Sequence, residues 1–188
     1  QSPIEGVLAL KRAHGLTSDQ VARIEVTTFH EAVRLATNRP KTTEEAQYST
    51  SFPCAVALVK EGVAPEDIAE DALHDPEILR LSTSLVMKES EHANARFPLE
   101  RLSQVTLVLN DGTRLEGAYM NPRWAPDAPA TETELRQKYR ALTEPILGVA
   151  HAHAIEAAID ALPNTGLPPL MDQLFRPISA PIMSGKSA

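Results

Sequence analysis

The stretch from Gln47 to Pro53 carries the residue types that most clearly suggest a binding site. It places the hydroxyls of Tyr48, Ser49, Thr50 and Ser51 next to one another, directly before an apolar segment expected to be helical. Hydroxyl groups and the free backbone N–H groups at a helix start can donate hydrogen bonds to a carboxylate, assisted by the helix dipole. The alternative is that these hydroxyls only cap a helix that follows a loop. The residues by themselves leave both interpretations open.

Histidines and the single cysteine are the other candidates for catalysis or metal binding. His151 and His153 are two positions apart, so on a helix they point in different directions and make a poor metal-binding pair. His30 and His74 could each act as a functional imidazole, but nothing in the sequence selects either one. Cys54 lies in an apolar run without a cationic neighbour that would lower the pKa of its thiol, which predicts a buried structural cysteine. The spacing of these residues therefore names no reaction.

Length, charge and composition argue against several classes of protein. The chain has 188 residues, enough for one large domain or two small ones, and 43% of them are hydrophobic, as in ordinary globular proteins. The net charge of −7 argues against a nucleic-acid partner, and no apolar run is long enough to predict a membrane span. One cysteine cannot form an internal disulfide, which favours a reducing compartment and predicts a cytoplasmic location. The chain begins with Gln1 and shows no signal peptide, so we expect further polypeptide upstream.

Capping residues and apolar spacing predict the helices. The first has Ser2 as its cap and Pro3 as its first helical residue, the position that proline prefers, and it ends at Gly15. A second covers 43–60, where Pro53 should kink or divide it because proline has no N–H to donate to the preceding turn. Shorter helices are expected over 30–36, 64–73 and 75–81, and further helices over 131–142, 151–162 and 168–175. Thr131 and Glu134 have the spacing of a capping box at the start of the helix over 131–142.

Alternating apolar residues predict the strands. Val21–Phe29 alternates as a half-buried strand does, and 85–88 forms a shorter one. Gln104–Tyr119 predicts a hairpin around Asp111 and Gly112, since glycine accepts the positive φ of a tight turn. Helices and strands are interspersed, with one antiparallel hairpin. This arrangement predicts an α+β fold: a small, mostly antiparallel sheet with helices packed on one face.

Several segments resemble the MmgE/PrpD family, in the family's order and spacing. Ala46–Pro53 and the Ala-rich stretch after it resemble the family's internal signature, a hydroxyl-bearing motif that runs into an Ala-rich helix. The resemblance also includes His14–Leu16 before the strand over 21–26, the hairpin over 105–113, and the loop at 121–123 with the helix over 138–142. It extends from Gln1 to about Ala161 and indicates the family's C-terminal domain. We therefore predict one such domain over 1–176 and a flexible tail over 177–188.

The resemblance implies a function as well as a fold. Family members include 2-methylcitrate dehydratase, cis-aconitate decarboxylase and iminodisuccinate epimerase, which act on small polycarboxylates. They use side-chain acid–base chemistry and need no iron–sulfur cluster, so we expect no metal and no cofactor. The family fold joins an α+β domain to a helical domain, built mainly from the N-terminal half, and homodimers are usual. The resemblance thus implies a site between two domains, of which the helical one lies outside this chain.

Residue by residue, the resemblance assigns one wall of that site to this chain. Gln1 matches a position that holds His or Gln in the active site, and Tyr48 and Ser49 match the hydroxyl-bearing signature. Phe52 matches a position where several members have a pocket Tyr, and it lacks that hydroxyl. The expected substrate-binding residues are Gln1, Tyr48, Ser49, Thr50, Ser51 and Phe52. None of these is a base at neutral pH, so we expect the base on the helical domain and no catalysis by this chain alone.

Two functions from different classes remain open. The first is the α+β half of a lyase or isomerase that dehydrates a substrate like 2-methylcitrate or citrate. The second is a non-catalytic binding or dimerisation module of the same fold, which Phe52 in place of Tyr suggests. In both cases, a domain separated from its partner should expose the apolar surface that the partner covers. We therefore expect an exposed apolar face, and either self-association or a bound partner.

Overall fold

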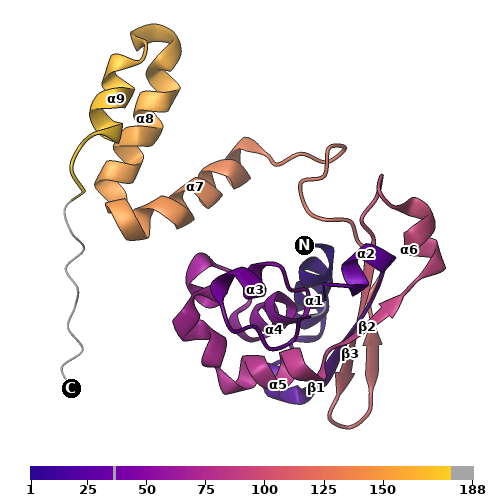
Figure 1. Cartoon of the computed structure of the whole chain (residues 1–188). Coiled ribbons are helices and arrows are strands. Elements are labelled where there is room, and N and C mark those ends of the chain that lie inside the picture. The colour runs from indigo at the N-terminus through magenta and orange to yellow at the C-terminus, as the bar shows by residue number, and fades with distance from the viewer. Residues whose placement is uncertain (36, 179–188) are drawn as a thin grey trace, which may run out of the picture. The chain divides into compact units, whose positions relative to one another are not determined.

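The computed structural model describes residues 1–35 and 37–178 and divides the chain into two compact units (Figure 1). Unit 1 is Gln1–Pro129 and unit 2 is Ala130–Ala188. The single domain predicted over 1–176 spans both units. Of the predicted tail, the part from residue 179 onward lies outside the described residues.

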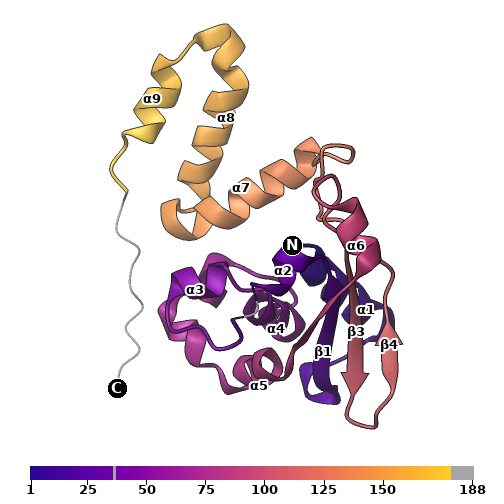
Figure 2. The same cartoon turned by 45° about the vertical axis from the view of Figure 1, so that its right-hand side comes forward.

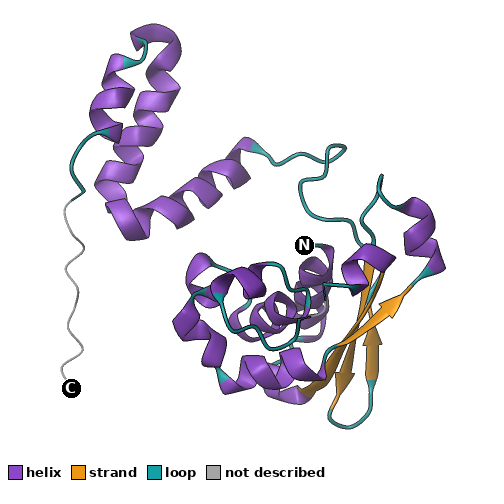
Figure 3. Ribbon diagram, in the orientation of Figure 1, coloured by secondary structure: helices purple, strands orange, loops and turns teal. Residues whose placement is uncertain are grey.

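A four-stranded sheet forms one side of unit 1 (Figure 3). Its strands are β1 (Val21–Thr28), β2 (Val86–Glu89), β3 (Ser103–Leu109) and β4 (Arg114–Glu116), in the order β2-β1-β3-β4. β3 pairs antiparallel with β1 and with β4, whereas β2 pairs parallel with β1. The α+β class is confirmed, and the sheet is mixed rather than purely antiparallel.

The hairpin between β3 and β4 turns where the sequence predicts. Gly112 has φ 86°, a conformation that costs glycine nothing because it has no Cβ. The carboxylate of Asp111 accepts a hydrogen bond from the Thr113 N–H at 2.8 Å, which stabilises the turn. The two residues therefore set the hairpin by local geometry alone.

Helices cover one face of this sheet (Figures 1 and 2). α1 (Ser2–His14) packs on β3 and α5 (Pro76–Ser84) packs on β1, while α4 (Ser51–Lys60) packs against both of these helices. The buried core lies between the helices and the sheet. Its fully buried side chains include Val7, Ile24, Val26, Phe52, Leu58, Leu81, Val105 and Leu107. The other face of the sheet carries charged side chains, as expected for the solvent side of such a sheet.

The start of α1 differs from its prediction by one residue. Gln1, not Ser2, is the N-cap, and Ser2 is the first helical residue. The Ser2 hydroxyl donates to the carbonyl of Arg101 at 2.8 Å and lies 2.9 Å from the Ser103 hydroxyl, which lies 2.9 Å from the Thr28 hydroxyl. Ser2 is therefore a buried link between α1 and the sheet instead of a cap.

The helix predicted over 43–60 is divided, at Tyr48–Thr50 rather than at Pro53. α3 (Thr43–Gln47) ends before Tyr48, and α4 begins at Ser51. Pro53 is the third residue of α4. Backbone N–H groups of the first helical turn have no partner within the helix, so the missing N–H of proline costs nothing there.

Short helices complete unit 1. They are α2 (His30–Val33), α6 (Glu91–Arg96) and the 3-10 helices η1 (Ser18–Gln20), η2 (Pro65–Ile68) and η3 (Glu70–His74). α6 was not predicted. Its cap is Ser90, whose hydroxyl accepts a hydrogen bond from the Ala93 N–H at 3.3 Å. This cap makes a short helix possible in a charged stretch that carries little apolar periodicity.

Unit 2 consists of helices. They are α7 (Glu132–Leu147), α8 (Val149–Thr165) and α9 (Pro168–Leu174). The predicted capping box at the start of α7 is present, since Thr131 accepts from the Glu134 N–H and the Glu134 carboxylate accepts from the Thr131 N–H. α7 extends five residues beyond its predicted end at 142, through Pro145.

Unit 2 exposes much of its apolar surface. Its buried residues are few, chiefly Ala152 and Ile155. Large apolar side chains are exposed on all of its helices: Leu135, Leu142, Ile146, Val149, Ile159, Leu167, Met171, Leu174 and Phe175. Unit 1 exposes fewer large apolar side chains, namely Leu35, Tyr48, Val63, Val86 and Leu99. An apolar face that a partner covers stays a prediction.

Candidate functional site

One end of unit 1 gathers the starts of two helices. The Lys11 ammonium donates to the carbonyl of Leu58 at 2.7 Å, so the last turns of α1 and α4 lie side by side. At the opposite end, the Thr50 N–H donates to the carbonyl of Leu35 at 2.8 Å, which ties the start of α4 to the segment after α2. The N-terminus, α2 and α6 lie together at this end in both views (Figures 1 and 2).

This end also contains the carboxyl ends of the parallel strands. β1 and β2 pair from Glu25–Val86 to Thr28–Glu89, so both strands end at the same edge of the sheet. The Ser2–Ser103–Thr28 hydroxyls connect the start of α1 to that edge. We call this end, with Gln1, Tyr48, His30, Glu89 and Arg123, the helix-start edge.

The six predicted substrate-binding residues divide into an exposed and a buried set. Gln1 is exposed, Tyr48 is 69% exposed and Thr50 is half-buried. Ser51 and Phe52 are buried at 1% and 0%, and Phe52 belongs to the core of unit 1. The exposed set can reach a ligand at the surface of this unit.

Ser49 makes its hydrogen bonds inside unit 1. Its hydroxyl donates to the carbonyl of Thr37 and accepts from the N–H of Phe52 at 3.1 Å. The hydroxyl therefore fixes the first turn of α4 and the preceding loop, as the capping alternative predicts. A role in substrate binding stays a prediction for all six residues, and only Gln1, Tyr48 and Thr50 have side chains exposed enough to reach a ligand.

Two arginines lie at the helix-start edge, together with the carboxylates of Glu5 and Glu89. The guanidinium of Arg123 lies 4.6 Å from the centre of the Trp124 ring and 3.7 Å from the carboxylate of Glu5, in the first turn of α1. Arg101 is exposed, and its carbonyl accepts the Ser2 hydroxyl. Trp124 has φ 64°, which is strained for a bulky residue, and such strain is concentrated at functional sites.

His30 is the residue that sequence reasoning did not select. In the structure its imidazole Nδ1 lies 3.0 Å from the carboxylate of Glu89. His30 follows β1 and Glu89 ends β2, and their contact depends on the parallel pairing of those strands. Because the sequence predicted a mostly antiparallel sheet, it gave no signal that these two residues meet.

The comparison with protein families identifies the chain. The model of the MmgE/PrpD C-terminal domain matches residues 1–164. The chain belongs to this family. A comparison with curated proteins gives no match. The MmgE/PrpD match covers unit 1 and the greater part of unit 2, and members of the family also have an N-terminal partner domain.

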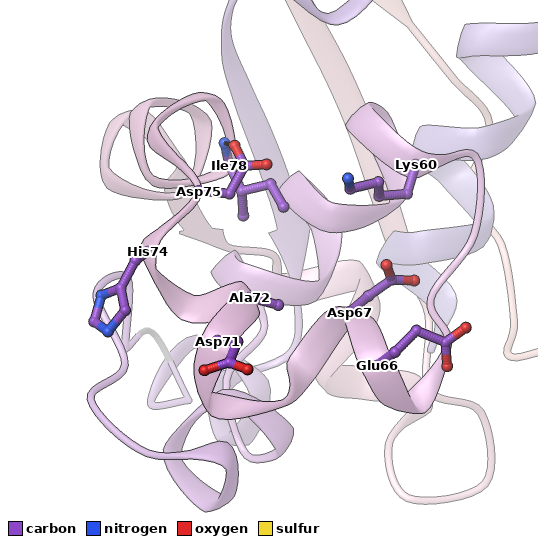
Figure 4. A pocket seen from close by; sticks show the side chains of 8 residues that line it. All are labelled: Lys60, Glu66, Asp67, Asp71, Ala72, His74, Asp75 and Ile78. Carbon is purple, nitrogen blue, oxygen red and sulfur yellow. Dashed lines mark hydrogen bonds between the residues drawn. The ribbon is translucent and has the colours of Figure 1, made fainter. Parts of the chain in front are cut away.

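A pocket of about 430 Å³ lies elsewhere on this MmgE/PrpD domain (Figure 4). Its lining comes from the end of α4, from η2 and η3 and from the start of α5: Lys60, Glu66, Asp67, Asp71, Ala72, His74, Asp75 and Ile78. Two of its carboxylates already accept hydrogen bonds from backbone N–H groups: Asp67 from Ala64 and Asp75 from Glu77, both at 2.9 Å. Four carboxylates against Lys60 make this pocket unfavourable for an anion.

Cys54 and a metal site were the other candidates that the sequence raised. Cys54 is fully buried, and that burial raises the pKa of its thiol to about 12, which fits the predicted structural cysteine. Among residues 1–35 and 37–178, no three histidine, cysteine or acidic side chains are arranged to hold a metal ion. Over the same residues, every helix is too short or too polar to cross a membrane.

Proposed function

We propose that this chain is the α+β part of an MmgE/PrpD lyase or isomerase that acts on a small polycarboxylate by side-chain acid–base chemistry. Dehydration of 2-methylcitrate or a citrate-like acid is the reaction we favour. The family match over residues 1–164 carries the proposal. The reaction needs hydrogen-bond donors for the carboxylates and a base at the carbon that loses its proton.

The helix-start edge offers suitable donors. The side chains of Gln1, Tyr48 and Thr50 can donate to carboxylate oxygens, and Arg101 and Arg123 add positive charge at the same end of the unit. Arginine binds carboxylates in two-pronged geometry, which suits a substrate with several carboxylates. The high exposure of Tyr48, at 69%, supports a site that a second domain closes.

The partner we propose is the helical domain of the family, bound through the exposed apolar side chains of unit 2. Leu142 and Ile146 of α7 and Leu174 and Phe175 near the end of α9 are between 42% and 77% exposed. Side chains of this kind, gathered on a small helical unit, indicate a surface that another polypeptide covers. A second copy of this chain is the alternative occupant, which corresponds to the predicted homodimer.

Reconstitution tests the proposal. This chain and a family helical domain are mixed, and the loss of water from 2-methylcitrate and citrate is followed by the absorbance of the product double bond. Activity of the mixture, with none from either part alone, supports the proposal. A folded complex that binds and converts none of these acids contradicts it.

The non-catalytic alternative rests on the buried hydroxyls. Ser49 and Ser51 lie inside unit 1, and Phe52 has no hydroxyl to offer. A module of the same fold that only binds or dimerises would show these features. The discriminating variants are Tyr48→Phe and Thr50→Val in the reconstituted mixture. A loss of activity favours the enzyme, whereas full activity in both variants removes the proposed donors from the mechanism.

A further inference from the structure

Three backbone carbonyls in the segment after α2 accept hydrogen bonds from the start of α4 and from α5. We call them the loop carbonyls, and they are those of Leu35, Thr37 and Asn38. The first accepts from the Thr50 N–H at 2.8 Å, and the second accepts from the Ser49 hydroxyl. The third accepts from the Ser82 hydroxyl of α5 at 2.7 Å. The segment after α2 is therefore fastened to two helices of unit 1.

Ser82 is a polar side chain in an apolar layer of unit 1. It is fully buried, as are its neighbours Ile78 and Leu81 on α5. A buried hydroxyl needs a hydrogen-bond partner, because burial removes it from water. The Asn38 carbonyl, 44 positions earlier in the chain, is that partner. Ser82 therefore fixes the segment after α2 against α5.

The start of α4 has little of its backbone left for a ligand. The Ser49 hydroxyl accepts from the Phe52 N–H at 3.1 Å, and Pro53 has no N–H. The Thr50 N–H donates to a loop carbonyl. A carboxylate at this end of unit 1 therefore depends on side-chain hydroxyls more than on the helix N-terminus, and the accessible hydroxyls here are those of Tyr48 and Thr50.

We infer that Ser49 and Ser82 are positioning residues of the polycarboxylate site, and that neither binds the substrate itself. This role rests on the proposed function and describes how its donors are held. Tyr48 and Thr50 flank Ser49 in the chain, so the hydrogen bonds of Ser49 fix the backbone between the two donors. Ser82 acts from α5, through the loop carbonyls. Donors that are held in advance lose less conformational entropy when a carboxylate binds.

Hydrogen exchange of the Thr50 amide in the full chain tests this coupling without a substrate. Ser82→Ala and Ser49→Ala should each lower the protection of that amide about tenfold, because the carbonyl that it contacts is no longer held, whereas the amides of β3 should keep their protection. Ser84→Ala is the matched control. Ser84 also lies on α5 and its hydroxyl also donates to backbone carbonyls, but none of these is a loop carbonyl. Unchanged protection of Thr50 in Ser82→Ala overturns the inference.

Kinetics of the reconstituted mixture with 2-methylcitrate and citrate test the role in the site. Ser82→Ala should lower kcat/KM about tenfold, mainly through a higher KM, because the donors bind carboxylates both before and during the reaction. In a chain that already carries Tyr48→Phe and Thr50→Val, Ser82→Ala and Ser49→Ala should change the residual kcat/KM little, since the donors that they position are gone. Ser84→Ala should leave kcat/KM unchanged in both backgrounds.

The outcomes separate the inference from the proposed function. An active wild-type mixture whose kcat/KM is the same in Ser82→Ala overturns the inference and leaves the proposed function standing. If Ser49→Ala lowers kcat/KM equally with and without Tyr48 and Thr50, Ser49 binds the substrate directly, and its positioning role is wrong. A folded complex that converts neither acid removes the proposed function, and the inference with it.

Discussion

Glu25 shows how a single residue organises the open face of the sheet. Its carboxylate is 5% exposed and contacts Arg23 at 2.8 Å, Lys88 at 2.6 Å and Arg114 at 2.8 Å. Arg114, and then Lys88 and Arg23, lower the pKa of Glu25 well below its usual range against the opposing effect of burial. One carboxylate therefore joins β1, β2 and β4 through three cations.

Glu25→Gln should destabilise the chain by about 1–2 kcal/mol at pH 7, because three cations lose their shared charge while remaining partly solvated. A carboxyl group with a lowered pKa in the folded state stabilises the fold above its unfolded pKa of about 4. That stabilisation is lost as the pH falls from about 4 toward the folded pKa. Urea unfolding of the wild-type chain and of Glu25→Gln, at pH 7 and at pH 3, measures the loss of unfolding free energy caused by the substitution. A loss that is equally large at both pH values contradicts this account.

For single residues, the sequence predicts whether a side chain is buried better than it predicts which distant residue that side chain contacts. Cys54 was correctly predicted as buried because its neighbours are apolar, and burial follows from composition. Phe52, in contrast, follows a hydroxyl-rich run yet lies in the core, because α4 turns that position inward. The contact of His30 with Glu89 joins residues 59 positions apart, and no local pattern encodes it.

Gly6 sets how closely α1 approaches the sheet. A Cβ built on Gly6 would lie 2.7 Å from Cγ2 of Val105 on β3, closer than side chains tolerate. Glycine normally costs a helix about 1 kcal/mol relative to alanine. The close approach of α1 to β3 thus makes glycine more favourable than alanine at position 6, the reverse of the usual preference in a helix.

Gly6→Ala should therefore destabilise the chain, by about 1–2 kcal/mol, because overpacking exceeds the gain in helix propensity. The double variant Gly6→Ala/Val105→Ala supplies the control. Val105→Ala removes the obstructing methyl groups, so the two changes together should cost less than the sum of each alone. Thermal unfolding of the three variants gives the coupling. Strict additivity would mean that Val105 is not the obstacle.

Elements defined by local signals were predicted and those defined by distant contacts were not. The hairpin between β3 and β4 and the capping box of α7 each depend on residues within a few positions, and both are present. The parallel pairing of β1 with β2 joins strands that are separated by four α-helices. Long-range pairing of this kind depends on packing of the whole unit, which periodicity does not contain.

Charge holds α7 to α8 in unit 2. Glu156 of α8 accepts from Arg140 and Arg136 of α7 at 2.9 Å and 2.8 Å, and these hydrogen bonds lower its pKa to about 2. Such a lowered pKa contributes stability above the unfolded value of about 4. As the pH falls from about 4 toward 2, this contribution should disappear. The protection of the α8 amides, relative to the intrinsic exchange rate at each pH, should therefore fall over that range, and in Glu156→Gln it should be low already at pH 5.

The two units contribute unequally to the stability of the whole chain. Each residue of the buried hydrophobic cluster belongs to unit 1, from Val7 to Leu107. Unit 2 relies on ion pairs and few buried side chains while it exposes apolar ones. Because buried apolar area supplies most of the folding free energy, unit 1 should fold independently of unit 2.

A chain that ends at Pro129 should therefore unfold cooperatively at nearly the same urea concentration as the full chain. It should also stay monomeric at concentrations where the full chain associates, because the exposed apolar side chains of unit 2 have been removed. Light scattering of both chains measures the association. Replacing Leu142 and Phe175 with Gln in the full chain is the matched control and should have the same effect without truncation. Association of the shortened chain would show that the contact surface lies on unit 1. The partner that closes the helix-start edge would then be expected to bind unit 1 as well.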